Sequence, residues 1–250
     1  MVPAFTYVAT AEVIGLLQLQ PVMVDVDPHT FNLTKDIVEE NLQPDIKAIV
    51  PVHLYGQCAE MEGIMQLAKE YGCKVVEDDA QAIGADYIFS DGSKKKSGVI
   101  GDIGCTSFYP SKNLGAYGDG GAIFCDDEVL GEKIRMIANH GQSVRYYHDL
   151  IGCNSRLDAI QAAILDIKLA QLDDYCHRRR SVADAYDAAF TQVDALVTPY
   201  RAPYSTHVFH QYTLKVKDGR RDELKDYLQG KEIPSMIYYP VPLNKQKAFA

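Results

Sequence analysis

Short apolar runs alternate with helix-like stretches through the first half of the sequence. Three runs, at 22–26, 48–52 and 74–77, are rich in valine and isoleucine, and the stretches at 9–18 and 61–71 have helical apolar spacing. Strands that are buried on both faces lack the strict polar–apolar alternation of half-exposed strands, and they are typical of a parallel sheet covered by helices on both sides. The sequence therefore predicts an α/β fold with a mostly parallel sheet.

The second half of the sequence predicts a long connecting helix and a smaller lobe. Residues 156–190 have helical apolar spacing with no glycine or proline, so we expect one long or bent helix that joins two lobes. This divides the chain into a large domain at 1–155, the connecting helix at 156–190 and a small α+β domain at 191–250. Within the small domain we expect a strand at 211–216, a helix at 221–229 and a strand at 236–239.

One lysine, Lys112, lies between a buried-looking run at 105–109 and another at 122–125, in the stretch SFYPSKNLGAYGDGG. The glycines let the backbone take conformations that other residues avoid and approach a ligand closely. Burial lowers the pKa of a lysine, and the neutral amine can then attack a carbonyl carbon as a Schiff-base nucleophile. A charged lysine beside a structural hairpin is the alternative, and this stretch alone leaves both open.

Three adjacent acids, Glu77, Asp78 and Asp79, end the run at 74–77. In open α/β sheets ligands bind at the carboxyl ends of the strands, so one of these carboxylates can pair with a ring nitrogen of a cofactor, and Gln81 can add a neutral hydrogen bond. Neighbouring residues of a strand point to opposite faces, so only one acid faces the ligand, and we expect Asp78. A solvated acidic turn is the alternative.

Composition excludes several classes of protein. A net charge of −9 argues against nucleic-acid binding, and no apolar run approaches the ~20 residues that span a bilayer. The six cysteines include no C-x-x-C pair, which favours reduced thiols in a cytoplasmic protein over disulfides or a metal site. A dinucleotide-binding Rossmann motif is disfavoured because GAYGDGG is not followed by a helical pattern.

Eight ordered segments carry a resemblance to a known family. They are PAFTYVAT, PVMVDVDPHTFNL, AIVPVHLYGQ, VVEDDAQAIGA, SFYPSKNLGAYGDGGAI, RMIANHGQ, GCNSRLDAIQAAIL and MIYYPVPL. Together they resemble the sugar aminotransferases of the DegT/DnrJ/EryC1/StrS family from end to end. Within the family, the segments DIGCTSFYPSKNLG and GDGGAI are most similar to those of enzymes that aminate C3 of a UDP-linked 3-keto sugar, such as the 3-oxo-glucuronate aminotransferases of O-antigen synthesis.

The resemblance implies a fold-type I enzyme that uses pyridoxal 5′-phosphate (PLP), with a sheet of the seven-stranded type. By position, Lys112 would be the Schiff-base lysine and Asp78 would pair with the pyridine nitrogen. Gln81 would contact the ring hydroxyl, Tyr7 would stack on the ring, and Ser107 would bind the phosphate.

The resemblance also implies a homodimer with shared active sites, in which Asn154 of the partner copy would reach the phosphate. Arg156, Tyr238 and Tyr239 would lie near the nucleotide-sugar substrate. The amino donor would be an amino acid, glutamate by family habit. The family implies no metal, membrane or nucleic-acid partner.

Two departures from the family pattern bear on activity. Family members usually have a small residue at the position of Asp79, so we expect an added charge near the ring. The chain also resembles an internal fragment, because the family's N-terminal phosphate-binding segment and its C-terminal end have no counterpart here; both domains would be incomplete and PLP binding weak. A non-catalytic fragment therefore remains an alternative, as does a PLP-dependent sugar dehydratase, although those relatives carry histidine in place of Lys112.

Overall fold

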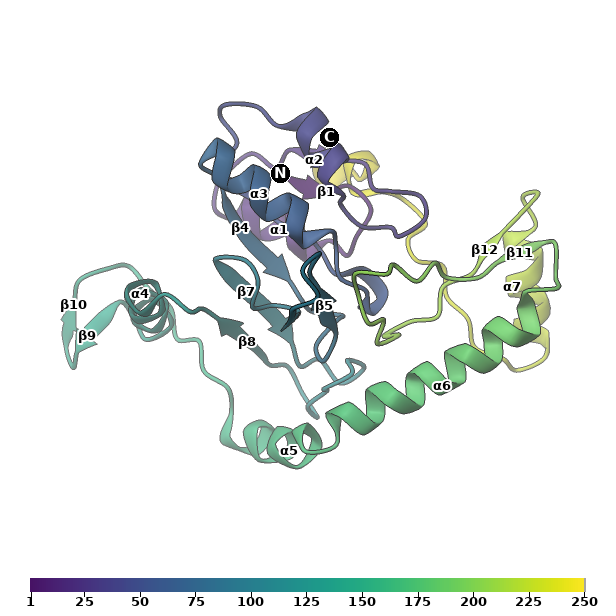
Figure 1. Cartoon of the computed structure of the whole chain (residues 1–250). Coiled ribbons are helices and arrows are strands. Elements are labelled where there is room, and N and C mark those ends of the chain that lie inside the picture. Colours follow the sequence, from purple (N-terminus) through teal and green to yellow (C-terminus); the bar gives the residue numbers. More distant parts are fainter. Residues whose placement is uncertain (250) are drawn as a thin grey trace.

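The computed structural model describes residues 1–249, and its centre is a four-stranded sheet (Figure 1). The strands are β3 (Ala48–Ile49), β4 (Lys74–Asp78), β7 (Ile103–Ser107) and β8 (Gly121–Phe124), in the order β3-β4-β7-β8. β3, β4 and β7 are parallel, and β8 returns antiparallel to β7. The carboxyl ends of β4 and β7 therefore lie side by side, which brings the acids of residues 77–79 next to the turn that carries Lys112.

A parallel pair, β1 (Val2–Pro3) and β2 (Met23–Val24), extends this sheet. The amide of Val50 donates to the carbonyl of Met1 at 2.9 Å, and the amino terminus donates to the carbonyl of Ala48 at 2.7 Å. β1 thus lies beside β3. The expected α/β class with a mostly parallel sheet is confirmed. Residues 1–249 supply this pair and the four central strands, and no seventh strand of the sheet lies within them.

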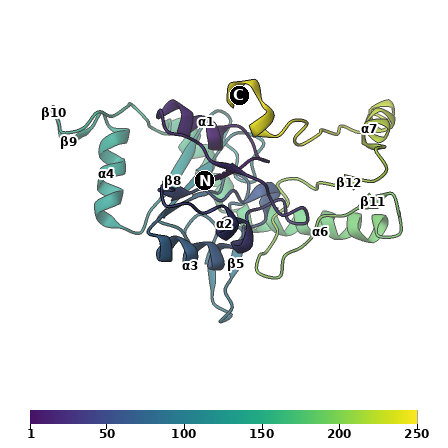
Figure 2. The same ribbon diagram turned by 90° about the horizontal axis from the view of Figure 1, so that it is seen from above.

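Helices cover both faces of the sheet. α1 (Ala9–Leu16) lies on one face, and α2 (Lys35–Asn41) and α3 (Met61–Tyr71) lie on the other, which is clearest from above (Figure 2). α2 begins at a capping threonine, Thr34, whose hydroxyl accepts the amide of Ile37. The main core between α3 and the sheet contains fully buried Leu33, Ile49, Ile64 and Val75.

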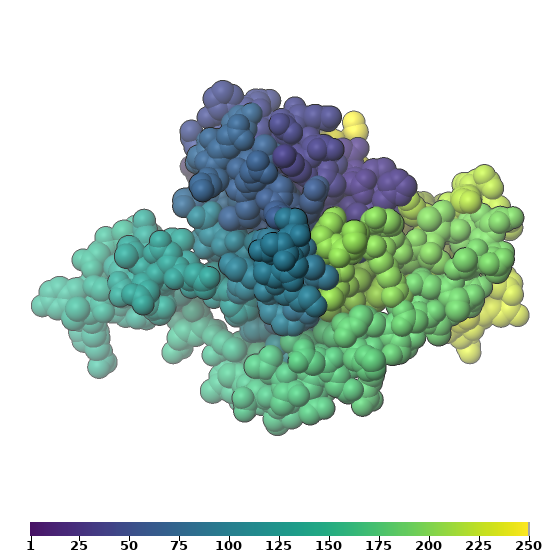
Figure 3. All heavy atoms as spheres, viewed as in Figure 1, coloured from purple at the N-terminus to yellow at the C-terminus, as the bar shows by residue number. Residues whose placement is uncertain are grey.

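An arm, residues 126–158, projects from the body after β8. It contains α4 (Glu128–Ala138) and a hairpin of β9 (Gln142–Val144) and β10 (Tyr147–His148). Figure 3 shows the arm standing away from the rest of the molecule. Its apolar side chains are unusually open to solvent, with Ile151 98% exposed and Tyr146 74% exposed.

The predicted connecting helix is two helices, α5 (Ala159–Leu169) and α6 (Leu172–Phe190), with a break at Ala170 and Gln171. They lead to a small lobe formed by β11 (Leu196–Val197), β12 (Lys215–Val216) and α7 (Arg221–Gly230), and the chain then returns to the body beside β1 (Figure 1). A separate hairpin, β5 (Asp86–Ile88) and β6 (Lys94–Lys96), follows β4. No helix within residues 1–249 is both long and apolar enough to cross a membrane.

Of the two strands predicted for the small domain, one is shorter than expected and the other is absent. Of 211–216 only Lys215–Val216 forms a strand, and 236–239 forms none. At the start of the first segment the amide of Gln211 donates to the carbonyl of Tyr55 in the body, and only its last two residues pair with β11. The second segment is held by aromatic packing, with Tyr239 against Phe5 at 5.7 Å between ring centroids. We call residues 202–211 the strap, because they tie the small lobe to the body.

Packing around the middle of β7 yields a stability prediction. A Cβ at Gly104 would overlap the carbonyl oxygen of Gly98, whereas a Cβ at Gly15 in α1 would meet nothing within 4 Å. We expect Gly104→Ala to destabilise the protein by about 1–3 kcal/mol or more, because overpacking displaces backbone. The matched control Gly15→Ala should be neutral or stabilising by about 0.5–1 kcal/mol. Urea unfolding of both variants measures this, and equal midpoints would contradict the close approach of Gly98 to Gly104.

Candidate active site

Lys112 lies in the turn that connects β7 to β8 and is half-buried. Its amide donates to the carbonyl of Tyr109 at 2.9 Å, and the amide of Ala116 donates to that of Phe108 at 2.7 Å, so the turn is closed on itself. Burial lowers the pKa of the Lys112 amine, and the charge of Asp78 opposes part of that shift. The amine is therefore deprotonated more readily than that of a surface lysine, as a nucleophile requires.

Asp78 ends β4 and faces the Lys112 side of the sheet. The hydroxyl of Thr10, at the start of α1, donates to its Oδ2 at 2.6 Å, and the amide of Ala80 donates to its Oδ1 at 3.1 Å. Both oxygens are thus oriented by hydrogen-bond donors. Sequence reasoning missed Thr10, because nothing in the sequence links it to an acid 68 residues away.

Asp79 points to the opposite side of β4, away from Lys112. The expectation that it adds a charge near the ring is wrong, because its carboxyl group is fully buried against the backbone of Gly98. Neither of its oxygens has a hydrogen-bond partner among the described residues. Burial raises the pKa of Asp79 to about 7, so its carboxyl group is mostly protonated in weakly acidic solution.

Glu77 also lies on this far side and is fully buried, but its carboxylate is saturated with donors. His53 Nε2 lies 2.8 Å from Oε2, and the amides of Gly98, Ile100 and Gly101 donate at 2.9, 2.6 and 2.6 Å. Burial alone would raise the pKa of Glu77, but these hydrogen bonds outweigh it and lower the pKa. Since the amide of Ala59 donates to His53 Nδ1 at 3.1 Å, the imidazole proton is on Nε2 and points at Glu77. Sequence reasoning did not identify this pair.

Gln81 connects the site to the C-terminal stretch. Its Oε1 accepts the amide of Tyr55 at 2.7 Å, and its Nε2 reaches the hydroxyl of Tyr239 at 3.4 Å. The hydroxyl of Tyr55 donates to the carbonyl of Tyr238 at 2.7 Å. The structure therefore brings Tyr238 and Tyr239 to Gln81, although Tyr239 is 158 residues away from it in sequence.

The other predicted residues divide into two groups. Ser107 ends β7 close to Lys112, where its Oγ accepts the amide of Tyr109 at 3.2 Å, and Tyr7 precedes α1 with 60% of its surface exposed. Asn154 and Arg156 are exposed residues of the arm, which stands away from the body that carries β4 and β7 (Figure 1). A single chain therefore does not assemble all of the predicted residues.

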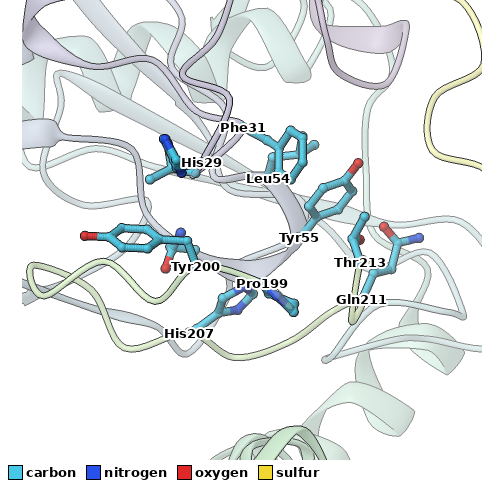
Figure 4. A pocket seen from close by; sticks show the side chains of 11 residues that line it. His29, Phe31, Leu54, Tyr55, Pro199, Tyr200, His207, Gln211 and Thr213 are labelled. Atoms are coloured by element: carbon cyan, nitrogen blue, oxygen red, sulfur yellow. The ribbon is translucent and has the colours of Figure 1, made fainter. Parts of the chain in front are cut away.

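A narrow cavity lies between the body and the strap (Figure 4), and Lys112 is not among the residues that line it. Its accessible interior is about 10 Å³, enough for about one water molecule, so it cannot hold a cofactor or a sugar. Within residues 1–249, no group of three or more His, Cys, Asp or Glu side chains is placed to hold a metal ion.

Comparison with known proteins identifies the family. The model of the DegT/DnrJ/EryC1/StrS aminotransferase family matches residues 1–250. The chain belongs to this family. It is 46% identical over 248 residues to the UDP-2-acetamido-2-deoxy-3-oxo-D-glucuronate aminotransferase of Pseudomonas aeruginosa, covering 99% of this chain and 67% of that protein.

Two further matches agree with this assignment. The UDP-N-acetyl-3-dehydro-alpha-D-glucosamine 3-aminotransferase of Acidithiobacillus ferrooxidans is 45% identical, and the match covers the whole of this chain and 66% of that protein. The crystal structure of NtdA from Bacillus subtilis with bound cofactor PMP superposes with a TM-score of 0.86 at 32% identity, covering 98% of this chain and 56% of that one. The chain thus spans about two thirds of the length of these curated relatives, and the expected family and fold type are confirmed.

The unusual state of Asp79 yields a prediction about stability and pH. The folded pKa of about 7 lies above the ordinary value of 3.8, so the folded protein holds this proton more tightly and loses stability as pH rises from about 4 to about 7. Asp79→Asn removes that loss. We expect its advantage in free energy of unfolding over the parent to grow between pH 4 and pH 8, by at most about 4 kcal/mol.

Urea unfolding at pH 4, 6 and 8 measures this difference. Glu39→Gln, an exposed substitution on α2, is the control and should follow the parent's pH slope, because Asp79 is intact in it. Identical slopes for the parent and Asp79→Asn would contradict a protonated Asp79.

Proposed function

We propose that this chain forms the PLP-binding part of a nucleotide-sugar aminotransferase. The observation that carries the proposal is the pairing of a half-buried lysine with an oriented carboxylate at the carboxyl ends of adjacent parallel strands, in a chain of this family. A lysine amine can form a bond with an aldehyde carbon. A carboxylate can pair with a pyridine nitrogen, and a carboxamide can hydrogen-bond to a ring hydroxyl.

The residues present fit PLP, with each group in a defined place. Lys112 would hold the cofactor's aldehyde carbon, Asp78 its pyridine nitrogen and Gln81 its ring hydroxyl. Ser107 would hold the phosphate, and Tyr7 would cover one face of the ring. When bound, PLP supplies an electron sink that stabilises negative charge on a substrate carbon.

The hydrogen bonds and burial of Asp78 and Lys112 suit them to two roles. Asp78, whose oxygens are fixed by Thr10 and Ala80, would accept a hydrogen bond from the pyridine nitrogen and so favour the protonated form of that nitrogen. Lys112, whose pKa is lowered by burial, would take a proton from Cα of the amino donor and return it at C4′ of the cofactor. The same residue would run these transfers in reverse on the keto sugar.

The substrate we propose is a UDP-linked 3-keto sugar, with an amino acid, glutamate by family habit, as the amino donor. The names of the two curated relatives described above support this, since both act on 3-oxo or 3-dehydro derivatives of UDP-sugars. Tyr239, placed beside Gln81, and Tyr238 are the residues of this chain that we assign to the sugar side of the site. The product would serve polysaccharide or amino-sugar synthesis, O-antigen among them.

We further propose a homodimer with shared active sites. Asn154 and Arg156 lie on the arm with exposed side chains, and the arm also exposes Ile151 and Tyr146. A second copy whose arm reached the first copy's site would bury these apolar groups and add Asn154 to the phosphate and Arg156 to the substrate. The six cysteines are all free, which supports a cytoplasmic location, where thiols stay reduced.

Lys112 gives the first test of this function. Incubation of the protein with PLP followed by borohydride should leave a pyridoxyl group on Lys112 alone, because reduction fixes the bond between the amine and the aldehyde carbon. Peptide mass spectrometry locates the label. Lys112→Ala should not be labelled, and exposed Lys94 within the parent is the internal control. A label that persists in Lys112→Ala would refute the assignment.

Mixed dimers test the shared site. Coexpressed Lys112→Ala and Arg156→Ala subunits should recover about a quarter of parental transaminase activity, because half of the dimers are mixed and one of their two sites is intact. Coexpressed Lys112→Ala and Asp78→Asn subunits are the matched control and should recover none, since both residues belong to the same half of the site. Recovery in neither mixture would mean that Arg156 acts within its own subunit, and recovery of about half of parental activity in the first mixture would mean that Arg156 is dispensable.

A further inference from the structure

The strap runs across the body and is fastened to it at several points. The amide of Ala202 donates to the side chain of Gln57 at 2.8 Å, and the amide of Cys58 donates to the hydroxyl of Ser205 at 2.9 Å. The amide of Val208 donates to the carbonyl of Gly56 at 2.8 Å. These bonds fix the course of the strap independently of the turn that carries Lys112.

Asn113, the residue after Lys112, joins this turn to the strap. Its side chain is buried, and its Nδ2 donates to the carbonyl of Val208 at 3.1 Å. Its Oδ1 is buried and has no hydrogen-bond partner among the described residues. Burying a carboxamide oxygen without a hydrogen bond costs free energy, so this asparagine occupies its buried position despite an energetic penalty. Residues kept at such a cost are expected at functional sites.

The far side of the strap is held by α6. Arg179 Nη1 donates to the carbonyls of Phe209 and His210 at 2.9 and 3.3 Å. Burial, followed by the positive charges of Lys112 and Arg179, lowers the pKa of His210 to about 3, so its imidazole is neutral beside the lysine. The strap therefore carries a neutral imidazole within electrostatic reach of Lys112, at the same residues that Arg179 holds.

We propose that Asn113 is a positioning residue for Lys112, which fixes the orientation of the lysine turn by binding the strap through the carbonyl of Val208. The inference deepens the proposed function, since it concerns the lysine assigned to the cofactor. If Asn113 acts in this way, the reactivity of Lys112 depends on the strap, because Val208 is 95 residues away from Asn113 in sequence. Without this bond, the turn keeps its internal hydrogen bonds but loses its attachment to the strap at Val208, and we expect the half-buried Lys112 amine to become more exposed to water.

The test measures the titration of Lys112 without cofactor or substrate. Trace acetic anhydride labels lysines in proportion to their neutral fraction, and mass spectrometry gives the labelling of Lys112 relative to exposed Lys94 from pH 6 to pH 11. In the parent, the midpoint for Lys112 should lie below that of Lys94, because burial lowers the pKa of Lys112. In Asn113→Ala, we expect the Lys112 midpoint to rise by about half a pH unit or more as the amine becomes hydrated.

Ser205→Ala is the matched control. It also removes one hydrogen bond between the strap and the body, but at a point away from the lysine turn. We expect it to lower the unfolding midpoint in urea by a similar amount while leaving the Lys112 titration unchanged. If Asn113→Ala does not fold, Asn113→Ser, which removes less volume and is too short to reach Val208, should show the same upward shift.

Two outcomes would overturn the proposal: a Lys112 midpoint in the folded Asn113 variant equal to the parent's, or an equal shift in Ser205→Ala. The outcome is separate from that of the proposed function. Labelling by acetic anhydride does not need PLP, so a positive result here can coexist with failure of PLP labelling at Lys112.

Discussion

The saturated carboxylate of Glu77 is the interaction on which the arrangement of the site depends. A buried, unpartnered anion would be strongly destabilising, but Glu77 accepts hydrogen bonds from His53 and from three backbone amides of residues 98–101. These bonds join the end of β4 to the segment that precedes β7. They therefore hold together the two parallel strands whose carboxyl ends carry Asp78 and the Lys112 turn.

The alternation of side chains along β4 separates the three adjacent acids into distinct roles. Glu77 and Asp79 face the interior, one as an anion with full hydrogen bonding and the other as a carboxyl group without partners among the described residues. Asp78 faces the opposite side, where Thr10 and Ala80 orient it. Burial of the Asp79 carboxyl group without partners lowers the stability of the fold. The same alternation leaves Asp78 as the one of the three acids that faces Lys112.

Much of the large domain was predictable from the sequence, because its signals are local. Valine-rich runs marked β4, and helical apolar spacing marked α3. The small lobe was less predictable. The segments at 211–216 and 236–239 have strand-like composition, but Gln211 bonds to Tyr55, only Lys215–Val216 forms a strand, and Tyr239 packs on Phe5. Partners so far away in sequence leave no local pattern.

The sequence by itself determined the family, the α/β class and the choice of Lys112, Asp78 and Gln81 as candidate residues. The order of motifs and the residues at the ends of strands can be read directly from it. Only the tertiary structure decided their environments. Thr10 meets Asp78, Tyr239 meets Gln81, and Asn113 meets Val208 across separations of 68, 158 and 95 residues. Burial lowers the pKa of Lys112, and that burial depends on which distant segments fold against the lysine.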